Sequence, residues 1–354
     1  MDRAALERFI VMRPAADAPR RQYADLLQST GDVERAEFIR IQLKLARYGV
    51  LGKRPPAVAE WEEREQALLK QHPEWSAPLE KLGAKAVRFH RGFVDGIVIS
   101  AANFINHADE IFAEAPCLRC LKITCAPGAV DNFFQMKPTC RFNRFDDRDA
   151  LHNYLEATSG DYDRSLRRAL AKGHDNPDRL REGIDLIGPT ATWLLLACAP
   201  LGRIEELDIS DNQLGPYGLK AFEASPFIRQ LKALDVSRNA INPRAREALY
   251  VGLSVGALTR STQLSGLNIL KCNGNDLRWC GAEWFADFGK FKHLKTLELR
   301  HNDIGREESL RKLVNSRRFP NLKRLELRGN PIDDSLRNEL EQRITLRGRS
   351  PPLP

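Results

Sequence analysis

The sequence lacks long apolar runs and the motifs of the familiar catalytic classes. Its most apolar stretch, residues 184–201, is interrupted by Asp185, Gly188 and two prolines, so it is too short to cross a bilayer. No G-x-S-x-G, H-E-x-x-H, Walker or G-x-G-x-x-G motif is present, and the seven His are dispersed. We therefore expect a protein that is not an enzyme, stays out of the membrane, and uses no cofactor and no small-molecule substrate.

Cysteine is also scarce, with seven residues scattered along a chain of 354. An odd number of Cys, in a chain whose first residues show no apolar signal segment, indicates reduced thiols and a cytoplasmic location. Only Cys117-x-x-Cys120, followed by Cys125 and Cys140, has a spacing that a zinc site could use. Structural zinc is the less favoured interpretation because no second close pair of Cys follows, so we expect no metal.

The charge balance favours no single class of partner. Lys and Arg number 55 against 47 Asp and Glu, which gives a formal net charge of +8. The excess is spread thinly, and no basic tract is long enough to hold phosphates by itself. A nucleic-acid partner bound through distributed Arg residues is therefore the less favoured alternative to a protein partner. With 42% hydrophobic residues, the chain can bury the cores of two or three domains.

The carboxy-terminal half contains a repeat. The pattern L-x-x-L-x-L-x-x-N-x-L recurs five times, with apolar or small residues four and eight positions after most copies. The copies place their asparagines at Asn212, Asn239, Asn275, Asn302 and Asn330, which are 27, 36, 27 and 28 residues apart. A short strand followed by a returning helix fits this spacing, and neither element is stable without its neighbours in the stack.

This repeat resembles the ribonuclease-inhibitor type of leucine-rich repeat. The resemblance implies an α/β leucine-rich-repeat solenoid over residues 178–343, a horseshoe with parallel strands inside and helices outside. A degenerate copy around Asp185 precedes the first clear one. Each repeated asparagine lies where the buried backbone leaves its strand, and an Asn amide can both donate to and accept from the neighbouring coil. We therefore predict that these asparagines satisfy the buried polar groups at the corners.

Residues 1–48 have a different pattern, typical of a small all-helical module. A predicted helix over residues 33–47 shows two adjacent apolar stripes, one with Phe38 and Ile41 and the other with Ile39 and Leu43, and both indicate burial. The module resembles the bacterial repeat-companion domain in Pro14, Asp17-Ala18-Pro19-Arg20, Tyr23-Ala24-Asp25, Leu27, Gly31-Asp32, Glu37-Phe38-Ile39 and Gln42. The resemblance implies bacterial origin and an accessory module placed ahead of repeats, and it implies no catalytic residue.

The remaining segments connect or interrupt these two parts. We expect residues 49–74 to form a linker and a further helix, and residues 75–125 to form an amino-terminal cap and a first repeat-like coil. An insertion over residues 126–177 is expected on one rim of the solenoid, where long insertions are often functional. Residues 344–354 are expected to form a frayed C-terminal tail.

Outward-facing residues of the predicted parallel strands should form columns, because neighbouring strands lie about 4.8 Å apart. These columns are acidic in the early coils and lean basic in the later ones, so we predict a non-catalytic interaction scaffold whose concave face binds a complementary protein. The predicted partner-binding residues are Glu206, Asp208, Asp235, Lys271, Glu298, Arg300, Arg324, Glu326 and Arg328. The alternatives are a merely solvated surface and a binding site on the insertion.

Overall fold

The structure is a computed structural model that describes residues 2–48, 55–124, 192, 195–212, 214–239, 241 and 255–347. The predicted insertion over residues 126–177, the degenerate repeat around Asp185 and tail residues 348–354 lie outside this description. Contacts between Cα atoms divide the chain into two compact units. The first unit contains Met1–Ile99 and Asp109–Leu121, and the second contains Ser100–Ala108 and Lys122–Pro354.

The first unit begins with helices and continues into a hairpin. Its elements are α1 (Arg3–Met12), α2 (Ala18–Ser29), α3 (Val33–Leu45), α4 (Ala57–Gln71), η1 (Pro73–Trp75), α5 (Ala77–Lys81), β1 (Ala86–His90) and β2 (Phe93–Ser100). Aspartates start two of these helices, because the Asp2 carboxylate accepts from Ala5 N at 2.7 Å and the Asp32 carboxylate accepts from Arg35 N at 3.3 Å. Strands β1 and β2 pair antiparallel.

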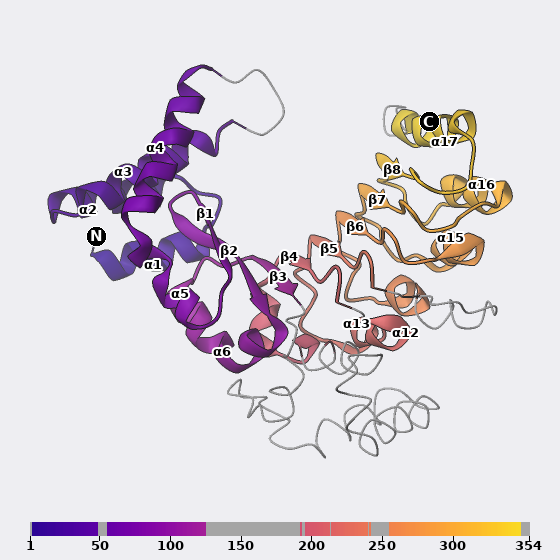
Figure 1. The fold of residues 1–354 in the computed structure, drawn as a ribbon, viewed down its shortest axis with the longest axis horizontal. Helices are drawn as coiled ribbons and strands as arrows, with labels where there is room; N and C mark the ends of the chain where they lie inside the picture. The colour runs from indigo at the N-terminus through magenta and orange to yellow at the C-terminus, as the bar shows by residue number, and fades with distance from the viewer. Residues whose placement is uncertain are drawn as a thin grey trace, which may run out of the picture. The chain divides into compact units, whose positions relative to one another are not determined.

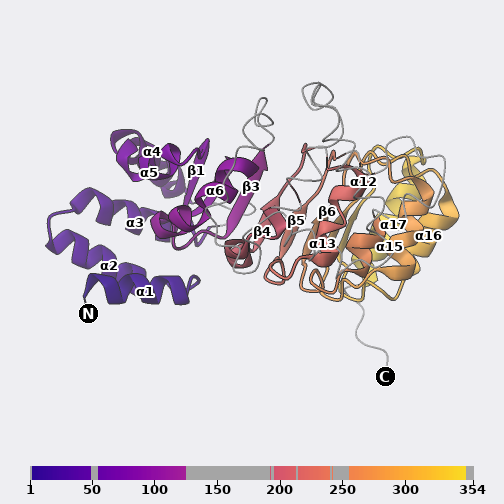
Figure 2. The ribbon, with the colours of Figure 1, turned by 90° about the horizontal axis from the view of Figure 1, so that it is seen from below.

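Helix α3 lies at the centre of this unit, beside α2 and α4 (Figure 2). Its two apolar stripes face two different clusters of side chains. The first cluster joins Ile39 and Leu43 to Leu6, Ile10, Tyr23, Ala24, Leu27, Ala36 and Cys117. The second joins Phe38 and Ile41 to Leu68, with Leu45, Trp61, Leu69, Trp75 and Phe89 packed around them. The prediction that both stripes are buried is confirmed.

The second cluster contains residues beyond residue 48, where the sequence predicted that the helical module ends. It contains side chains from α4, η1 and β1, and the unit extends to Ile99. The physical reason is that α3 is apolar on two sides, while α1 and α2 cover only one of them. Residues 2–48 therefore share a core with residues 55–99.

The turn between β1 and β2 contacts α3 directly through Gly92. Gln42 Oε1 accepts from Gly92 N at 3.0 Å, and Arg35 Nη2 donates to Gly92 O at 2.8 Å. Gly92 has a φ of +86°, and a Cβ atom added there would lie 2.5 Å from Ile39 Cγ1. Only glycine combines this left-handed backbone with so close an approach to the helix.

The second unit contains the repeats. Its short strands are β4 (Glu206–Asp208), β5 (Ala233–Asp235), β6 (Ile269–Lys271), β7 (Thr296–Glu298) and β8 (Arg324–Glu326). They pair parallel and in register, so that Leu207, Leu234, Leu270, Leu297 and Leu325 stack as one row, at most 2% exposed. This row is the core of the repeats, as the pattern of leucines predicted.

Helices return along one side of these strands (Figure 1). The described ones are α12 (Gly215–Gly218), α13 (Ala221–Ala224), α15 (Arg278–Phe288), α16 (Glu307–Asn315) and α17 (Asp334–Arg347), and η3 (Ala199–Arg203) precedes β4. Two further elements, α6 (Ala101–Glu114) and β3 (Cys120–Thr124), follow β2. Strands β1 to β8 follow one another in sequence order in an eight-stranded, mostly parallel sheet, so the chain has an α/β repeat fold. Among the described residues, no helix combines the length and apolar character needed to span a membrane.

Candidate functional site

The strand register places the predicted site residues in columns, which together we call the strand face. The first column consists of Glu206, Ala233, Ile269, Thr296 and Arg324, and the middle column of Asp208, Asp235, Lys271, Glu298 and Glu326. The third column, two residues further along each coil, consists of Ser210, Ser237, Asn273, Arg300 and Arg328. All nine residues predicted from the sequence therefore lie on this one face.

A ladder of asparagines supports the strand face at the end of each strand. Asn239 illustrates the contacts, because its Nδ2 donates to Ile209 O at 2.9 Å and its Oδ1 accepts from Asn212 N at 2.8 Å. Both contacts recur in Asn275, Asn302 and Asn330, and Asn212 makes the first of them with Ile123 O. The predicted role of these asparagines at the corners is confirmed.

Each ladder asparagine follows a residue with a left-handed backbone. The φ values are +60° at Asp211, +54° at Arg238, +65° at Gly274, +53° at His301 and +76° at Gly329. This conformation suits glycine best and is tolerated by Asp and His, so Arg238 is the least favourable of the five residues. The sequence signals the turn most clearly at the two glycines, and Arg238 gives no local indication of it.

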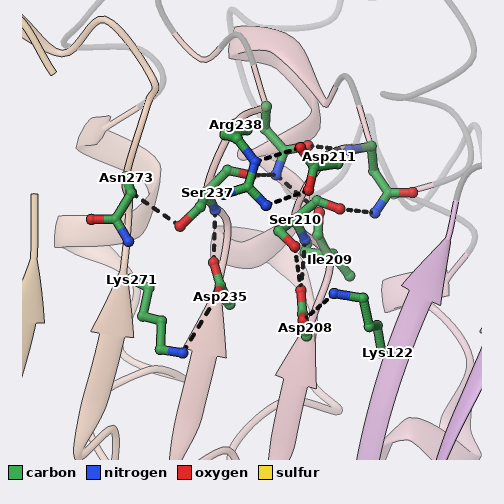
Figure 3. A network of polar contacts seen from close by, with 12 residues as sticks. Lys122, Asp208, Ile209, Ser210, Asp211, Asp235, Ser237, Arg238, Lys271 and Asn273 are labelled. Atoms are coloured by element: carbon green, nitrogen blue, oxygen red, sulfur yellow. Dashed lines mark hydrogen bonds and ion pairs between the residues drawn. The ribbon is translucent and has the colours of Figure 1, made fainter. Parts of the chain in front are cut away.

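Two acidic residues of the early coils, Asp208 and Asp235, are paired within the face itself (Figure 3). Lys122 Nζ lies 2.6 Å from Asp208 Oδ2, and Lys271 Nζ lies 3.7 Å from Asp235 Oδ2. Burial opposes ionisation of Asp208, but hydrogen bonds from Lys122 and Ser210 outweigh it and hold the pKa of this carboxyl below its ordinary value. Sequence reasoning missed Lys122, although the Leu118-x-x-Leu121-x-Ile123 pattern places it at the middle position of an earlier coil.

The later coils pair their charges as well. Glu326 accepts from Arg300 Nη2 at 2.9 Å and from Arg324 Nε at 2.5 Å. Burial opposes ionisation of Glu326, yet the two guanidinium groups keep its pKa below the ordinary value. Glu298 accepts from Asn273 Nδ2 at 3.0 Å. Two cations therefore share the Glu326 carboxylate, and Glu298 and Glu341 act on the charge of Arg324 as well.

Hydrogen bonds also run along the third column and order its backbone. Asn273 N donates to Ser237 Oγ at 3.0 Å, and Arg300 N donates to Asn273 Oδ1 at 2.8 Å. Ser237 N in turn donates to Asp235 Oδ1 at 2.9 Å. These bonds satisfy backbone N–H groups at the ends of the short strands, so the polar residues of the strand face are held in place before any partner arrives.

The pairing of Lys122 with Asp208 predicts a pH-dependent stability difference. Replacing Lys122 by Met should lower the free energy of unfolding at neutral pH, because a half-buried carboxylate loses its cation. The folded pKa of Asp208 lies below the ordinary Asp value, so the stabilising contribution is present above that value and is lost as pH falls through the folded pKa. Urea unfolding of both proteins should therefore differ at neutral pH, and the difference should shrink as pH falls below the ordinary Asp pKa of about 3.9 and through the lower folded pKa of Asp208. An undiminished difference at low pH would contradict this role.

The cysteines that sequence analysis singled out include two outside the described residues, Cys125 and Cys140. Within the part of the chain that the structure describes, no group of three or more His, Cys, Asp or Glu residues is placed to hold a metal ion. Cys272 occupies an inward position beside β6, where other coils have Leu, Ile or Val, and is 1% exposed. Burial raises the pKa of its thiol well above the ordinary value, so this residue is not a nucleophile.

Comparison with known families agrees with the geometry of the coils. A family model described as "Leucine Rich repeat" matches residues 204–222, 292–307 and 320–335. No curated protein matches the chain. The matched segments contain β4, β7 and β8, and the intervening β5 and β6 share the same register and asparagine ladder. The chain therefore carries leucine-rich repeats at these three positions.

Proposed function

We propose that this protein is a non-catalytic scaffold that binds a protein partner through the strand face. The observation that carries the proposal is the set of three side-chain columns on parallel strands in register, placed over a continuous asparagine ladder. Repeat proteins use such extended surfaces for recognition, and leucine-rich repeats commonly mediate contacts between proteins. We propose further that the repeats curve into a horseshoe with this face on the inside.

The internal ion pairs of the strand face favour a partner that recognises its shape and its mixture of polar and charged groups. Asp208, Asp235 and Glu326 are each held by cations of the same face, so their side chains are ordered without a partner. Prior ordering lowers the entropy cost of association. The same pairing argues against the nucleic-acid alternative, because Arg300 and Arg324 already share a carboxylate and are not two free phosphate ligands.

Charge reversal on the strand face should weaken partner binding. Glu206 is exposed and forms no ion pair with any described residue, and Arg328 is exposed in the third column of the last coil. Glu206→Lys combined with Arg328→Glu should slow association and reduce affinity about tenfold, since complementary charges chiefly set the association rate. These positions are better targets than Asp208, where a Lys would face Lys122 and disturb the fold.

The partner must first be identified by pull-down from native extract, with and without nuclease, and its binding then measured by surface plasmon resonance. Glu308→Lys is the matched control, because this side chain is 88% exposed on α16, away from the strands. Equal binding by the charge-reversed protein and the control would place the site elsewhere, and residues 126–177 would become the next candidate. Loss of capture on nuclease treatment would instead support the nucleic-acid alternative.

A further inference from the structure

From β4 to β8, the first column of the strand face presents an exposed acidic, an exposed apolar and an exposed basic side chain in turn. Glu206 is exposed at the β4 end, Ile269 is 36% exposed on β6, and the Arg324 side chain is 61% exposed on β8. Ala233 and Thr296 occupy the strands between them. The column therefore presents an acidic group, an apolar group and a basic group in line, separated by smaller side chains.

The charged side chains at the two ends of the first column are both exposed. Glu206 has no ion-pair partner among the residues that the structure describes. Arg324 shares the carboxylate of Glu326 with Arg300, and Glu298 and Glu341 also act on its charge, but its side chain is 61% exposed. In the middle column, Asp208 and Asp235 are each paired with a lysine, and Glu298 accepts a hydrogen bond from Asn273. Exposed charged groups and exposed apolar surface therefore coincide in the first column.

The spacing of the three groups matches one particular peptide conformation. Neighbouring strands lie about 4.8 Å apart, so Glu206 and Ile269 are separated by about 9.6 Å, as are Ile269 and Arg324. A polyproline II helix has three residues per turn and rises about 3.1 Å per residue, which repeats the same face every 9.3 Å or so. Side chains at positions i, i+3 and i+6 of such a segment would thus meet all three groups.

We propose that the first column binds a polyproline II segment of the partner that carries a basic, an apolar and an acidic residue three positions apart. The basic residue lies over Glu206, the apolar residue over Ile269 and the acidic residue over Arg324. The proposal rests on the proposed function of the strand face and specifies the chemistry of its partner. The order of the three groups along the column fixes the direction of a given segment, with its basic end at β4 and its acidic end at β8.

Synthetic peptides provide the probe. A fluorescein-labelled peptide Pro-Arg-Pro-Pro-Leu-Pro-Pro-Glu-Pro has the required spacing, and Pro-Arg-Pro-Leu-Pro-Glu-Pro-Pro-Pro has the same composition with the groups two positions apart. Fluorescence anisotropy with the full chain should show at least tenfold tighter binding of the first peptide. Equal binding of the two peptides, or no binding of either at millimolar concentration, would overturn the proposal.

Two variants link the peptide to the column. Ile269→Asp should weaken binding of the correctly spaced peptide at least tenfold, whereas Phe288→Asp should not, because Phe288 is an exposed residue of α15 outside the strand face. Glu206→Lys should reverse the preference at one end, so that a peptide with Glu in place of its Arg binds better than the original. Binding that survives Ile269→Asp, or that ignores the charge at residue 206, contradicts the proposed contacts.

The outcome also separates this proposal from the proposed function. If Glu206→Lys combined with Arg328→Glu weakens binding of the native partner while the peptides fail, the strand face binds its partner by another mode and only the polyproline II proposal is lost. If the native partner is insensitive to both charge changes, the proposed function fails as well.

Discussion

Replacing Asn239 by Ala should lower the free energy of unfolding by about 2–4 kcal/mol, since each buried backbone group that loses its partner costs about 1–3 kcal/mol. Asn239 is fully buried in the middle of the ladder. Its amide satisfies Asn212 N at 2.8 Å and Ile209 O at 2.9 Å, and Ala can satisfy neither. Leu should be at least as disruptive, because it adds volume to the corner and supplies no polar atom.

Chemical unfolding followed by circular dichroism measures this effect. The matched control is Asn338→Ala, an exposed position in α17, which should change stability by less than about 0.5 kcal/mol. Hydrogen exchange should also show faster exchange at the corners of the two coils that Asn239 joins. An unchanged denaturation midpoint for Asn239→Ala would falsify the view that the ladder stabilises the repeats.

The second large effect is expected at Gly92, where Ala should destabilise the first unit by about 2–5 kcal/mol. Part of the cost is backbone strain, about 1–3 kcal/mol, because Gly92 has a φ of +86°. The rest is overpacking, since the new Cβ would lie 2.5 Å from Ile39 Cγ1 and 3.0 Å from Ile39 Cα. The helix backbone cannot move aside without breaking the contacts of Gly92 with Gln42 and Arg35.

Gly31→Ala is the matched control because Gly31 has a similar φ of +93° and nothing lies within 4 Å of its added Cβ. This variant should cost only about 1 kcal/mol. Hydrogen exchange of α3 and of the β1–β2 hairpin should rise strongly in Gly92→Ala and little in Gly31→Ala. Equal effects of the two substitutions would show that strain alone matters and that the hairpin does not depend on its contact with α3.

Local periodicity determined much of the architecture. Leucines at fixed spacing predicted the parallel coils, because only inward side chains at those positions produce a continuous core such as the row from Leu207 to Leu325. The recurring asparagines predicted the ladder, because a buried corner leaves the same backbone groups unsatisfied in every coil. The two stripes on α3 predicted burial on two sides, although the sequence did not indicate which elements cover them.

Tertiary structure alone decided the features that depend on residues far apart in the chain. Lys122 and Asp208 are 86 residues apart, and their pairing neutralises an acidic position in the middle column of the strand face. The contact of Gly92 with Ile39 and the left-handed backbone at Arg238 also have no local signature. A periodic pattern in the sequence indicates which side of a helix or strand is buried. A single contact between distant residues leaves no such pattern, because only folding brings the two residues within bonding distance.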